Sequence, residues 1–283
     1  MEIKKVGVVG FGLMGGGIAE VCAKAGYDTV VVEVAQQFLD KGYKNVTVSL
    51  EKAVKREKMT AEEKDAALGR LKGTLNMEEF GDRDLVIEAA IENLDEKKKI
   101  FASLDKTCPP AAILASNTSC LSILDMAAMT GRPDKVLGLH FFSPVPVMQL
   151  VEIVRTLVTS DETMALAKPF CESIGKTTVL CQDIPGFIAN RLSMAYLAYT
   201  IRFYEQGMAS KEDIDKTMRL GLNHPMGPLE LSDFIGLDTV YYIMSAMYDE
   251  LKDPLFAPPT VLKKMVTAGH LGRKTGKGFY DYR

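Results

Sequence analysis

A glycine-rich segment near the amino terminus has the spacing of a dinucleotide-binding loop. It reads G-x-G-x-x-G, lies between an apolar run at 6–9 and a helical pattern over 13–25, and consists of Gly10, Phe11, Gly12, Leu13, Met14 and Gly15. In that setting the first glycine permits a tight turn, the second lets the backbone approach a pyrophosphate, and the third lets helix and strand pack closely. The segment predicts a dinucleotide site at a helix amino terminus, with an ordinary tight turn as the alternative.

An acidic residue follows at the position expected for the ribose of that dinucleotide. Glu33 comes directly after the β-branched run 29–32, about 20 residues beyond the glycine motif. A carboxylate there accepts hydrogen bonds from a ribose diol and repels a 2′-phosphate. Residues 34–39 contain neither Arg nor Lys. The sequence therefore favours NAD over NADP.

His140 is the candidate for proton transfer. It is one of three histidines and ends the apolar run 136–139, and ligands of open α/β sheets bind beyond the carboxyl ends of strands. Glu152 follows after a loop that contains two prolines, and a chain that turns back there brings its carboxylate to the imidazole. The pair then has the base-and-orienting-acid logic of general acid–base catalysis. The alternatives are a structural histidine and a solvated glutamate.

Two further segments have both a functional and a structural interpretation. Residues 116–119, Ser-Asn-Thr-Ser, follow an apolar run and either contact ligand oxygens or cap the next helix. Residues 41–58 contain six basic and two acidic side chains. That segment either attracts a phosphorylated ligand or forms a solvated helix face.

The elements that position these residues alternate between strands and helices. Strands are predicted at 6–9, 29–32, 85–87, 113–115, 136–139, 151–154 and 177–180, with a helix over 97–106 among the helical stretches between them. Such alternation indicates a parallel sheet with helices on both faces. Beyond residue 183 helices predominate, at 187–205, 210–220, 238–251 and 259–268. We therefore expect an α/β Rossmann-like domain at 1–183 and an all-α domain at 184–283.

The composition excludes several other classes. The 283 residues are 47% hydrophobic and 25% charged with a net charge of −3, which argues against a nucleic-acid binder held by bulk positive charge. The sequence contains no apolar run of 18 residues, so it predicts no membrane span. Five cysteines without CxxC spacing predict neither a zinc site nor a disulfide framework, and they fit a reducing cytoplasm. The helix at 187–205 is apolar on more than one face, which predicts burial in a core or at a subunit interface.

Seven sequence blocks along nearly the whole chain resemble the L-3-hydroxyacyl-CoA dehydrogenase family, closest to its bacterial short-chain members. They are Gly-Phe-Gly-Leu-Met-Gly at 10–15, Ile-Glu-Ala-Ala at 87–90, Ala-Ser-Asn-Thr-Ser at 115–119, Gly-Leu-His-Phe-Phe-Ser-Pro at 138–144, Pro-Gly-Phe-Ile-Ala-Asn-Arg at 185–191, His-Pro-Met-Gly-Pro at 224–228 and Gly-Lys-Gly-Phe-Tyr at 276–280. The resemblance implies an NAD-dependent enzyme that interconverts (S)-3-hydroxybutyryl-CoA and acetoacetyl-CoA. It also implies a homodimer or higher homo-oligomer formed largely by the helical domain.

The same resemblance assigns roles to individual positions. It implies that His140 is the catalytic base and Glu152 its acidic partner, with Ser119 and Asn190 near the substrate oxygen and the histidine. The implied cofactor contacts, beyond the glycine motif, are Glu33, Glu92, Lys97, Asn117, Ser119, Ser143 and Lys274. The implied substrate contacts, besides Ser119 and Asn190, are Ser49 and Arg56.

Two positions depart from the family pattern. Ser143 stands where Asn is common, and Glu33 stands where Asp is common. Two alternatives remain beside the family's activity: a related NAD-dependent dehydrogenase of a non-CoA hydroxyacid or sugar acid, and a non-catalytic NAD-binding protein on the same scaffold.

Overall fold

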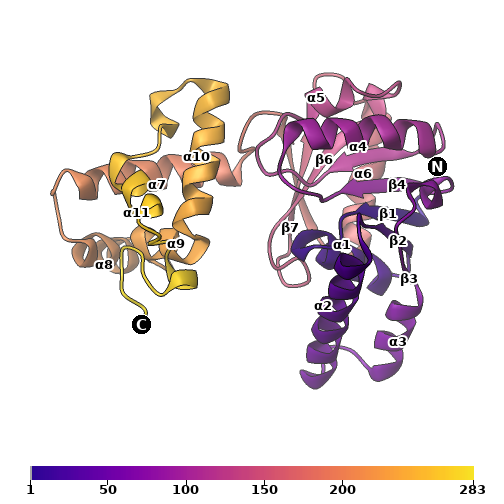
Figure 1. Cartoon of the computed structure of the whole chain (residues 1–283), viewed down its shortest axis with the longest axis horizontal. Coiled ribbons are helices and arrows are strands. Elements are labelled where there is room, and N and C mark those ends of the chain that lie inside the picture. Colours follow the sequence, from indigo (N-terminus) through magenta and orange to yellow (C-terminus); the bar gives the residue numbers. More distant parts are fainter. Residues whose placement is uncertain (1) are drawn as a thin grey trace. The chain divides into compact units, whose positions relative to one another are not determined.

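The computed structural model describes residues 2–283 and divides into two compact units, the first ending at Asp183 and the second spanning Ile184–Arg283. Within the described part of the first unit, eight strands form one sheet in the order β3-β2-β1-β4-β5-β6-β7-β8 (Figure 1). The strands are β1 (Lys5–Val9), β2 (Asp28–Val32), β3 (Leu71–Thr74), β4 (Leu85–Glu88), β5 (Ile113–Ser116), β6 (Val136–Phe141), β7 (Leu150–Arg155) and β8 (Thr177–Gln182).

The first six strands of the sheet pair in parallel, and one junction breaks that rule. β6 and β7 are antiparallel, while β7 and β8 are again parallel to each other. The loop 142–149 between β6 and β7 is too short for the crossover that a parallel pair requires, so the chain reverses direction. The register of this reversal places His140 opposite Glu152. The predicted sheet is therefore mostly rather than wholly parallel.

Helices cover both faces of the sheet (Figure 1). One face carries α1 (Leu13–Lys24), α2 (Gln36–Lys55), α3 (Ala61–Gly69) and α6 (Asp161–Ser173), whose buried side chains share one core with the strands. The other carries α4 (Leu94–Thr107), α5 (Ile123–Ala127) and the short η1 (Met77–Phe80). This layered arrangement confirms the Rossmann-like prediction, and it places the carboxyl ends of β1, β2, β4, β5 and β6 at one edge.

The second unit is helical. It contains α7 (Ala189–Glu205), α8 (Lys211–Gly221), α9 (Pro228–Ile235), α10 (Leu237–Leu251) and α11 (Thr260–Thr267). Their core includes Leu197, Ile201, Leu237 and Met244, all fully buried. Ser210 caps α8 by accepting a hydrogen bond from the backbone N–H of Asp213 at 3.1 Å.

The elements differ from the sequence-based prediction in a few places. β3 was not predicted, because Leu-Lys-Gly-Thr has no apolar run and the strand lies at the sheet edge. The helix expected over 187–205 begins at Ala189, since Gly186 and Phe187 have φ values of 80° and 44°, outside the right-handed helical region. Between residues 2 and 283, no helix is both long and apolar enough to cross a bilayer.

Candidate active site

The glycine motif forms the turn from β1 into α1. Gly10 has a φ of +95°, and its N–H donates to the carbonyl of Val32 at 2.8 Å. A Cβ on Gly15 would lie 1.9 Å from the carbonyl oxygen of Gly10, so the helix can approach the strand only where this side chain is absent. These two glycines are required by the backbone itself.

Gly12 has a different reason to be glycine. A Cβ built on it meets no protein atom within 4 Å. As the N-cap of α1 it supplies no side-chain hydrogen bond, and the first turn of α1 has no acidic residue. A helix amino terminus of this kind favours an anion. The space beside Gly12 and the uncapped helix end fit a pyrophosphate, and Phe11, Leu13 and Met14 complete the loop around them.

Glu33 lies at the carboxyl end of β2, beside the glycine loop. Its carboxylate accepts hydrogen bonds from the backbone N–H of Phe11 at 2.6 Å and from that of Val34 at 3.0 Å. The side chain is therefore held at the edge of the loop by the backbone. A carboxylate in this position fits the ribose-binding role that the sequence predicts.

A buried network of charges occupies the carboxyl ends of β4 and β5. Glu88 is fully buried and accepts hydrogen bonds from Lys97 at 2.6 Å, from the Ala90 N–H at 2.7 Å and from Ser116 at 2.7 Å. Lys97, also fully buried, lies 3.3 Å from the carboxylate of Glu92.

Glu92 connects these buried charges to the loop after β5. Its carboxylate accepts from the hydroxyl of Thr118 at 2.6 Å and from the backbone N–H of Ser119 at 2.9 Å. The segment 116–119 thus belongs to the site edge, while the cap of the next helix, α5, is Ser122. The ion pairs fix the backbone that presents Ser119.

The segment also braces β6. The side-chain oxygen of Asn117 accepts from the backbone N–H of Phe141 at 2.9 Å, next to His140. Ser143 is exposed in the loop that follows β6. Asn117 and Ser143 therefore both lie near the end of the strand that carries the histidine.

His140 and Glu152 form a buried pair across the β6–β7 junction. His140 Nδ1 lies 2.6 Å from Glu152 Oε2, and the two residues are 5% and 1% exposed. An ionised carboxylate only accepts, so Nδ1 donates and the imidazole orientation and tautomer are fixed. The Phe142 ring packs against the imidazole with centroids 4.6 Å apart. The arrangement suits an imidazole that exchanges a proton through Nε2. The carboxylate of Glu152 would stabilise the positive charge of the protonated imidazole.

The thiols beside the site do not provide an alternative nucleophile. Burial, with Glu92 nearby, raises the pKa of Cys120 to about 12. Burial, with Glu152 and Asp183 nearby, raises the pKa of Cys181 to about 12. Both thiols stay protonated at neutral pH, and a protonated thiol is a poor nucleophile.

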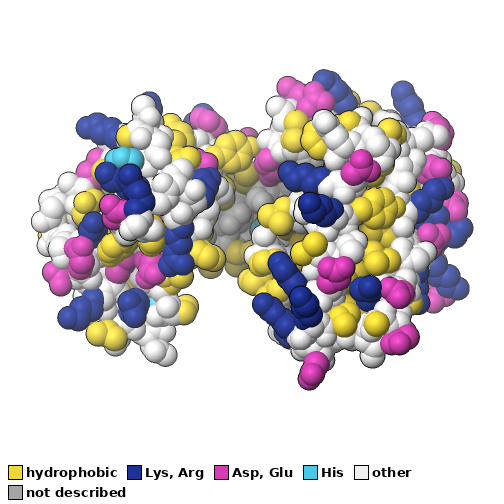
Figure 2. Space-filling view, turned by 60° about the horizontal axis from the view of Figure 1, so that its bottom comes forward, with side chains coloured by type: hydrophobic (Ala, Val, Ile, Leu, Met, Phe, Trp, Pro, Cys, Tyr) yellow, Lys and Arg dark blue, Asp and Glu magenta, His cyan; other side chains and the backbone are white. Residues whose placement is uncertain are grey.

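Besides Ser119, the predicted substrate contacts on the first unit lie on and directly after α2. Ser49 is half-buried and hydrogen-bonds to Glu20, a buried residue of α1. Arg56, which caps the carboxyl end of α2, is exposed. Leu39, Val46 and Leu50 form the inward face of this helix. Basic side chains are spread over the outer surface of the unit (Figure 2), so a solvated face and an anion-attracting face both fit this geometry.

The other two predicted residues belong to the helical unit. Asn190 lies in the first turn of α7. Lys274 lies in a short 3-10 segment near the carboxyl terminus, and its ammonium is 2.6 Å from the carboxylate of Asp238.

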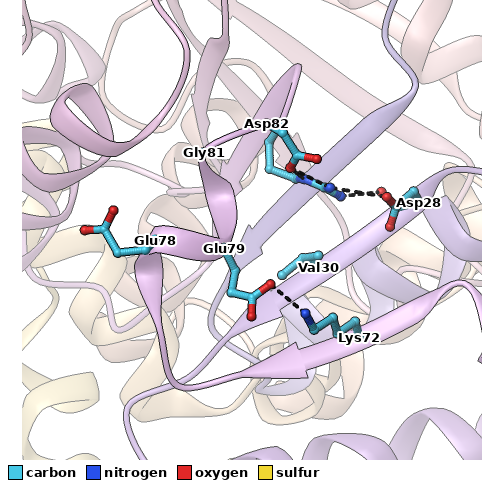
Figure 3. A pocket seen from close by; sticks show the side chains of 8 residues that line it. Asp28, Val30, Lys72, Glu78, Glu79, Gly81 and Asp82 are labelled. Atoms are coloured by element: carbon cyan, nitrogen blue, oxygen red, sulfur yellow. Dashed lines mark hydrogen bonds and ion pairs between the residues drawn. The ribbon is translucent and has the colours of Figure 1, made fainter.

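A cavity of about 450 Å³ lies at the other end of β2, beside η1 (Figure 3). Most of its charged side chains pair with one another: Lys72 with Glu79 at 2.6 Å, and buried Arg83 with Asp28 and Asp82. Burial tends to raise the pKa of Asp82, but hydrogen bonds from Lys5 and Arg83 leave it below its ordinary value. The cavity adjoins the amino-terminal end of a strand, away from the glycine loop, and carries no part of the candidate site.

Sequence reasoning missed two buried groups that support the site. Glu88 is an acid at the end of an otherwise apolar strand, and that break in the pattern was the available signal. Lys176 stands directly before β8 and donates to carbonyls of the loop after β6. Nothing in its local sequence marks it as buried.

Comparison with known proteins gives matches over the whole chain. Residues 5–184 match the model of the 3-hydroxyacyl-CoA dehydrogenase NAD-binding domain, and residues 186–282 match that of the 3-hydroxyacyl-CoA dehydrogenase C-terminal domain. A 3-hydroxybutyryl-CoA dehydrogenase of Mycobacterium tuberculosis is 49% identical over 99% of both chains. A probable 3-hydroxybutyryl-CoA dehydrogenase of Deinococcus radiodurans is 47% identical over 98% of this chain and 100% of its own. The crystal structure of (S)-3-hydroxybutyryl-CoA dehydrogenase PaaH1 from Ralstonia eutropha superposes with a TM-score of 0.96 at 44% identity, covering both chains fully.

Proposed function

The chain belongs to the 3-hydroxyacyl-CoA dehydrogenase family, and we propose that it interconverts (S)-3-hydroxybutyryl-CoA and acetoacetyl-CoA. It is an NAD-dependent dehydrogenase, and its cofactor is NAD(H). The short-chain substrate is supported by the names of its relatives in Mycobacterium and Ralstonia. The observation that carries the catalytic part of the proposal is the buried His140–Glu152 pair at the carboxyl edge of the sheet.

His140 acts as the general base when the alcohol is oxidised and as the general acid when the ketone is reduced. In the first direction its Nε2 takes the proton of the 3-hydroxyl group, and in the second it returns that proton to the new alcohol. Glu152 keeps the imidazole oriented and stabilises the imidazolium through the 2.6 Å contact. When bound, the nicotinamide supplies the hydride acceptor or donor.

The proposed cofactor contacts begin at the glycine loop of the first unit. The glycine loop and the start of α1 bind the pyrophosphate, and Glu33 binds the adenosine ribose. The uncapped helix end and the open space at Gly12 support this assignment. Further contacts are proposed for Glu92, Lys97, Asn117, Ser119, Ser143 and Lys274.

The acyl-CoA substrate binds along a second set of residues. Ser119 and Asn190 hold the reacting oxygen, while Ser49 and Arg56 approach the CoA moiety. The exposure of Arg56 and the basic outer face of α2 support an interaction with CoA phosphates.

The test is the loss of reduced-cofactor absorbance with acetoacetyl-CoA, with NADH and NADPH measured in parallel. Rapid loss with NADH is expected. For His140→Ala we expect turnover to fall by at least about 100-fold, because general acid–base catalysis contributes about 10²–10⁴-fold, while NADH binding stays near normal. Folded wild-type protein that binds NADH but does not oxidise it would leave a non-CoA substrate or a non-catalytic role. Wild-type turnover in His140→Ala would remove the catalytic assignment.

We also propose that the protein is a homodimer or a higher homo-oligomer. Leu192 and Tyr199 of α7 are 68% and 67% exposed, and an apolar hollow of about 440 Å³ lies between α7 and α8. A second copy of the chain is the partner that this surface fits. Sedimentation at micromolar concentration should give at least a dimer, and Tyr199→Glu should shift it toward monomer. A wild-type monomer would contradict this proposal.

The five cysteines support one more part of the proposal. All are unpaired, and four are buried. Such thiols fit a reducing compartment, and we place the enzyme in the cytoplasm on that ground. Fractionation of cells that express the tagged protein tests this assignment.

A further inference from the structure

Lys176 is a buried cation outside the residues assigned to catalysis or binding above. It stands between α6 and β8 and is 7% exposed. Its ammonium donates hydrogen bonds to the carbonyl oxygens of Val145 and Met148, the second at 2.8 Å. Both acceptors belong to the loop 142–149, so one side chain joins two points of that loop to the start of β8.

That loop connects the two members of the proposed catalytic pair. It begins after β6, which carries His140, and ends before β7, which carries Glu152. Ser143, a proposed cofactor contact, lies within it. The loop also packs on α1, because a Cβ on Gly17 would lie 2.8 Å from the Cβ of Val145. The loop that Lys176 contacts therefore packs on the helix of the glycine motif and also connects the two members of the catalytic pair.

Titratable groups of α1 and α6 surround the ammonium of Lys176. The groups that face it are Glu20, Cys22 and Lys24 of α1 and Cys171 of α6. Burial and the nearby Lys24 lower the pKa of Lys176, while Glu20 acts in the opposite direction. A buried ammonium is costly unless it has acceptors. Here the acceptors are the carbonyl oxygens of Val145 and Met148.

We propose that Lys176 is a positioning residue for the dehydrogenase reaction, fixing the loop 142–149 so that His140, Glu152 and Ser143 keep their relative places. Its ammonium group donates to the carbonyls of Val145 and Met148, and these contacts hold the loop where it packs against α1. Lys176 itself does not touch the substrate. The inference rests on the proposed function and adds a residue that acts through the backbone.

The test compares Lys176→Met with two matched variants. Lys176→Met keeps the length of the side chain but removes the charge and the donors. Lys168→Met makes the same change at an exposed position of α6, and Glu20→Gln removes the buried counter-charge while leaving the loop contacts. For each variant we would measure kcat per NADH-binding site, the KM for both substrates, the urea midpoint, and hydrogen exchange of the segment 142–149.

We expect kcat per NADH-binding site to fall by about tenfold in Lys176→Met, since small misplacements of reacting groups cost up to about 100-fold. Exchange in 142–149 should accelerate. Lys168→Met should match wild type. Glu20→Gln should lower the urea midpoint but keep kcat, because it leaves both loop contacts of Lys176 in place.

Three results would overturn the inference. They are an unchanged kcat per NADH-binding site in folded Lys176→Met, unchanged exchange of 142–149 in that variant, and an equal loss of kcat in Glu20→Gln. If Lys176→Met does not fold, Lys176→Gln, which keeps a shorter donor, is measured in its place. A wild-type protein that does not reduce acetoacetyl-CoA would refute the proposed function, while the exchange measurement would still decide whether Lys176 holds the loop.

Discussion

Replacing Glu152 by Gln is the sharpest test of the proposed proton transfer. Gln has almost the shape of Glu and keeps a side-chain oxygen that can accept from His140 Nδ1. The substitution therefore removes the negative charge while preserving most of the geometry. In the oxidising direction the imidazole becomes positively charged as the reaction proceeds, and in the reducing direction it must be charged at the outset. Both directions should lose rate.

The size of the effect follows from the burial and the distance. His140 and Glu152 are 5% and 1% exposed, and the contact is 2.6 Å long, so water screens it little. A hydrogen bond to a charged group contributes about 1.5–3 kcal/mol. If that energy is realised mainly in the transition state, kcat falls by about 10- to 150-fold. NADH affinity should change little, because the pair lies apart from the glycine loop.

The assay is steady-state reduction of acetoacetyl-CoA in Glu152→Gln, His140→Asn and the double variant, with NADH binding as the folding control. Glu162→Gln, the same change at an exposed position of α6, is the matched control. Because the two residues are proposed to act as a unit, the double variant should be scarcely slower than His140→Asn. A kcat for Glu152→Gln within twofold of wild type, or fully additive losses, would refute the reasoning.

Four further outcomes are expected. Gly12→Ala should unfold like wild type but raise the Kd for NADH by about tenfold or more, as titration will show, because its Cβ enters only the space for the pyrophosphate. Gly15→Ala, whose Cβ would lie 1.9 Å from a backbone oxygen, should lose about 1–3 kcal/mol or more in urea unfolding. Arg56→Ala should raise the KM for acetoacetyl-CoA with little change in kcat. Asp82 has a lowered folded-state pKa, so its ion pairs stabilise the fold above its unfolded pKa and lose that effect as the pH falls through the folded value. Asp82→Asn should therefore be less stable by under about 1 kcal/mol at pH 7, and unfolding measurements should show this difference disappear as the pH falls below the folded-state pKa of Asp82.

The sequence predicts the parts of the fold that depend on local patterns. The turn at Gly10, the strand directly before Glu33 and the strand carrying His140 each follow from an apolar run and the residue type after it. The structure confirms these strands and places their carboxyl ends at one edge of the sheet. The glycine motif is predictable because positive φ and close backbone approach restrict which residue can stand there.

The sequence does not predict the buried charges that support the site. Glu88 and Lys176 have partners on other elements, at separations such as the 28 residues between Ser116 and Glu88. Charged residues are mostly solvated, so a local pattern assigns them to the surface. β3 escaped prediction for a related reason. Its place at the edge of the sheet depends on pairing with β2, and its own four residues lack an apolar run.

The His140–Glu152 pair is predictable from the sequence only in part. Its formation depends on the number of residues in the loop between β6 and β7 as well as on the types of the two residues. The two side chains meet because the antiparallel register pairs Gly138 with Val154 and His140 with Glu152. Side chains alternate between the faces of a strand, so a register shifted by one residue would move Glu152 to the opposite face. The loop 142–149 sets that register, and Lys176 holds the loop at two carbonyls. The segment from His140 to Glu152 thus brings the pair together through its register, and in our proposal Lys176, immediately before β8, holds the loop that keeps that register.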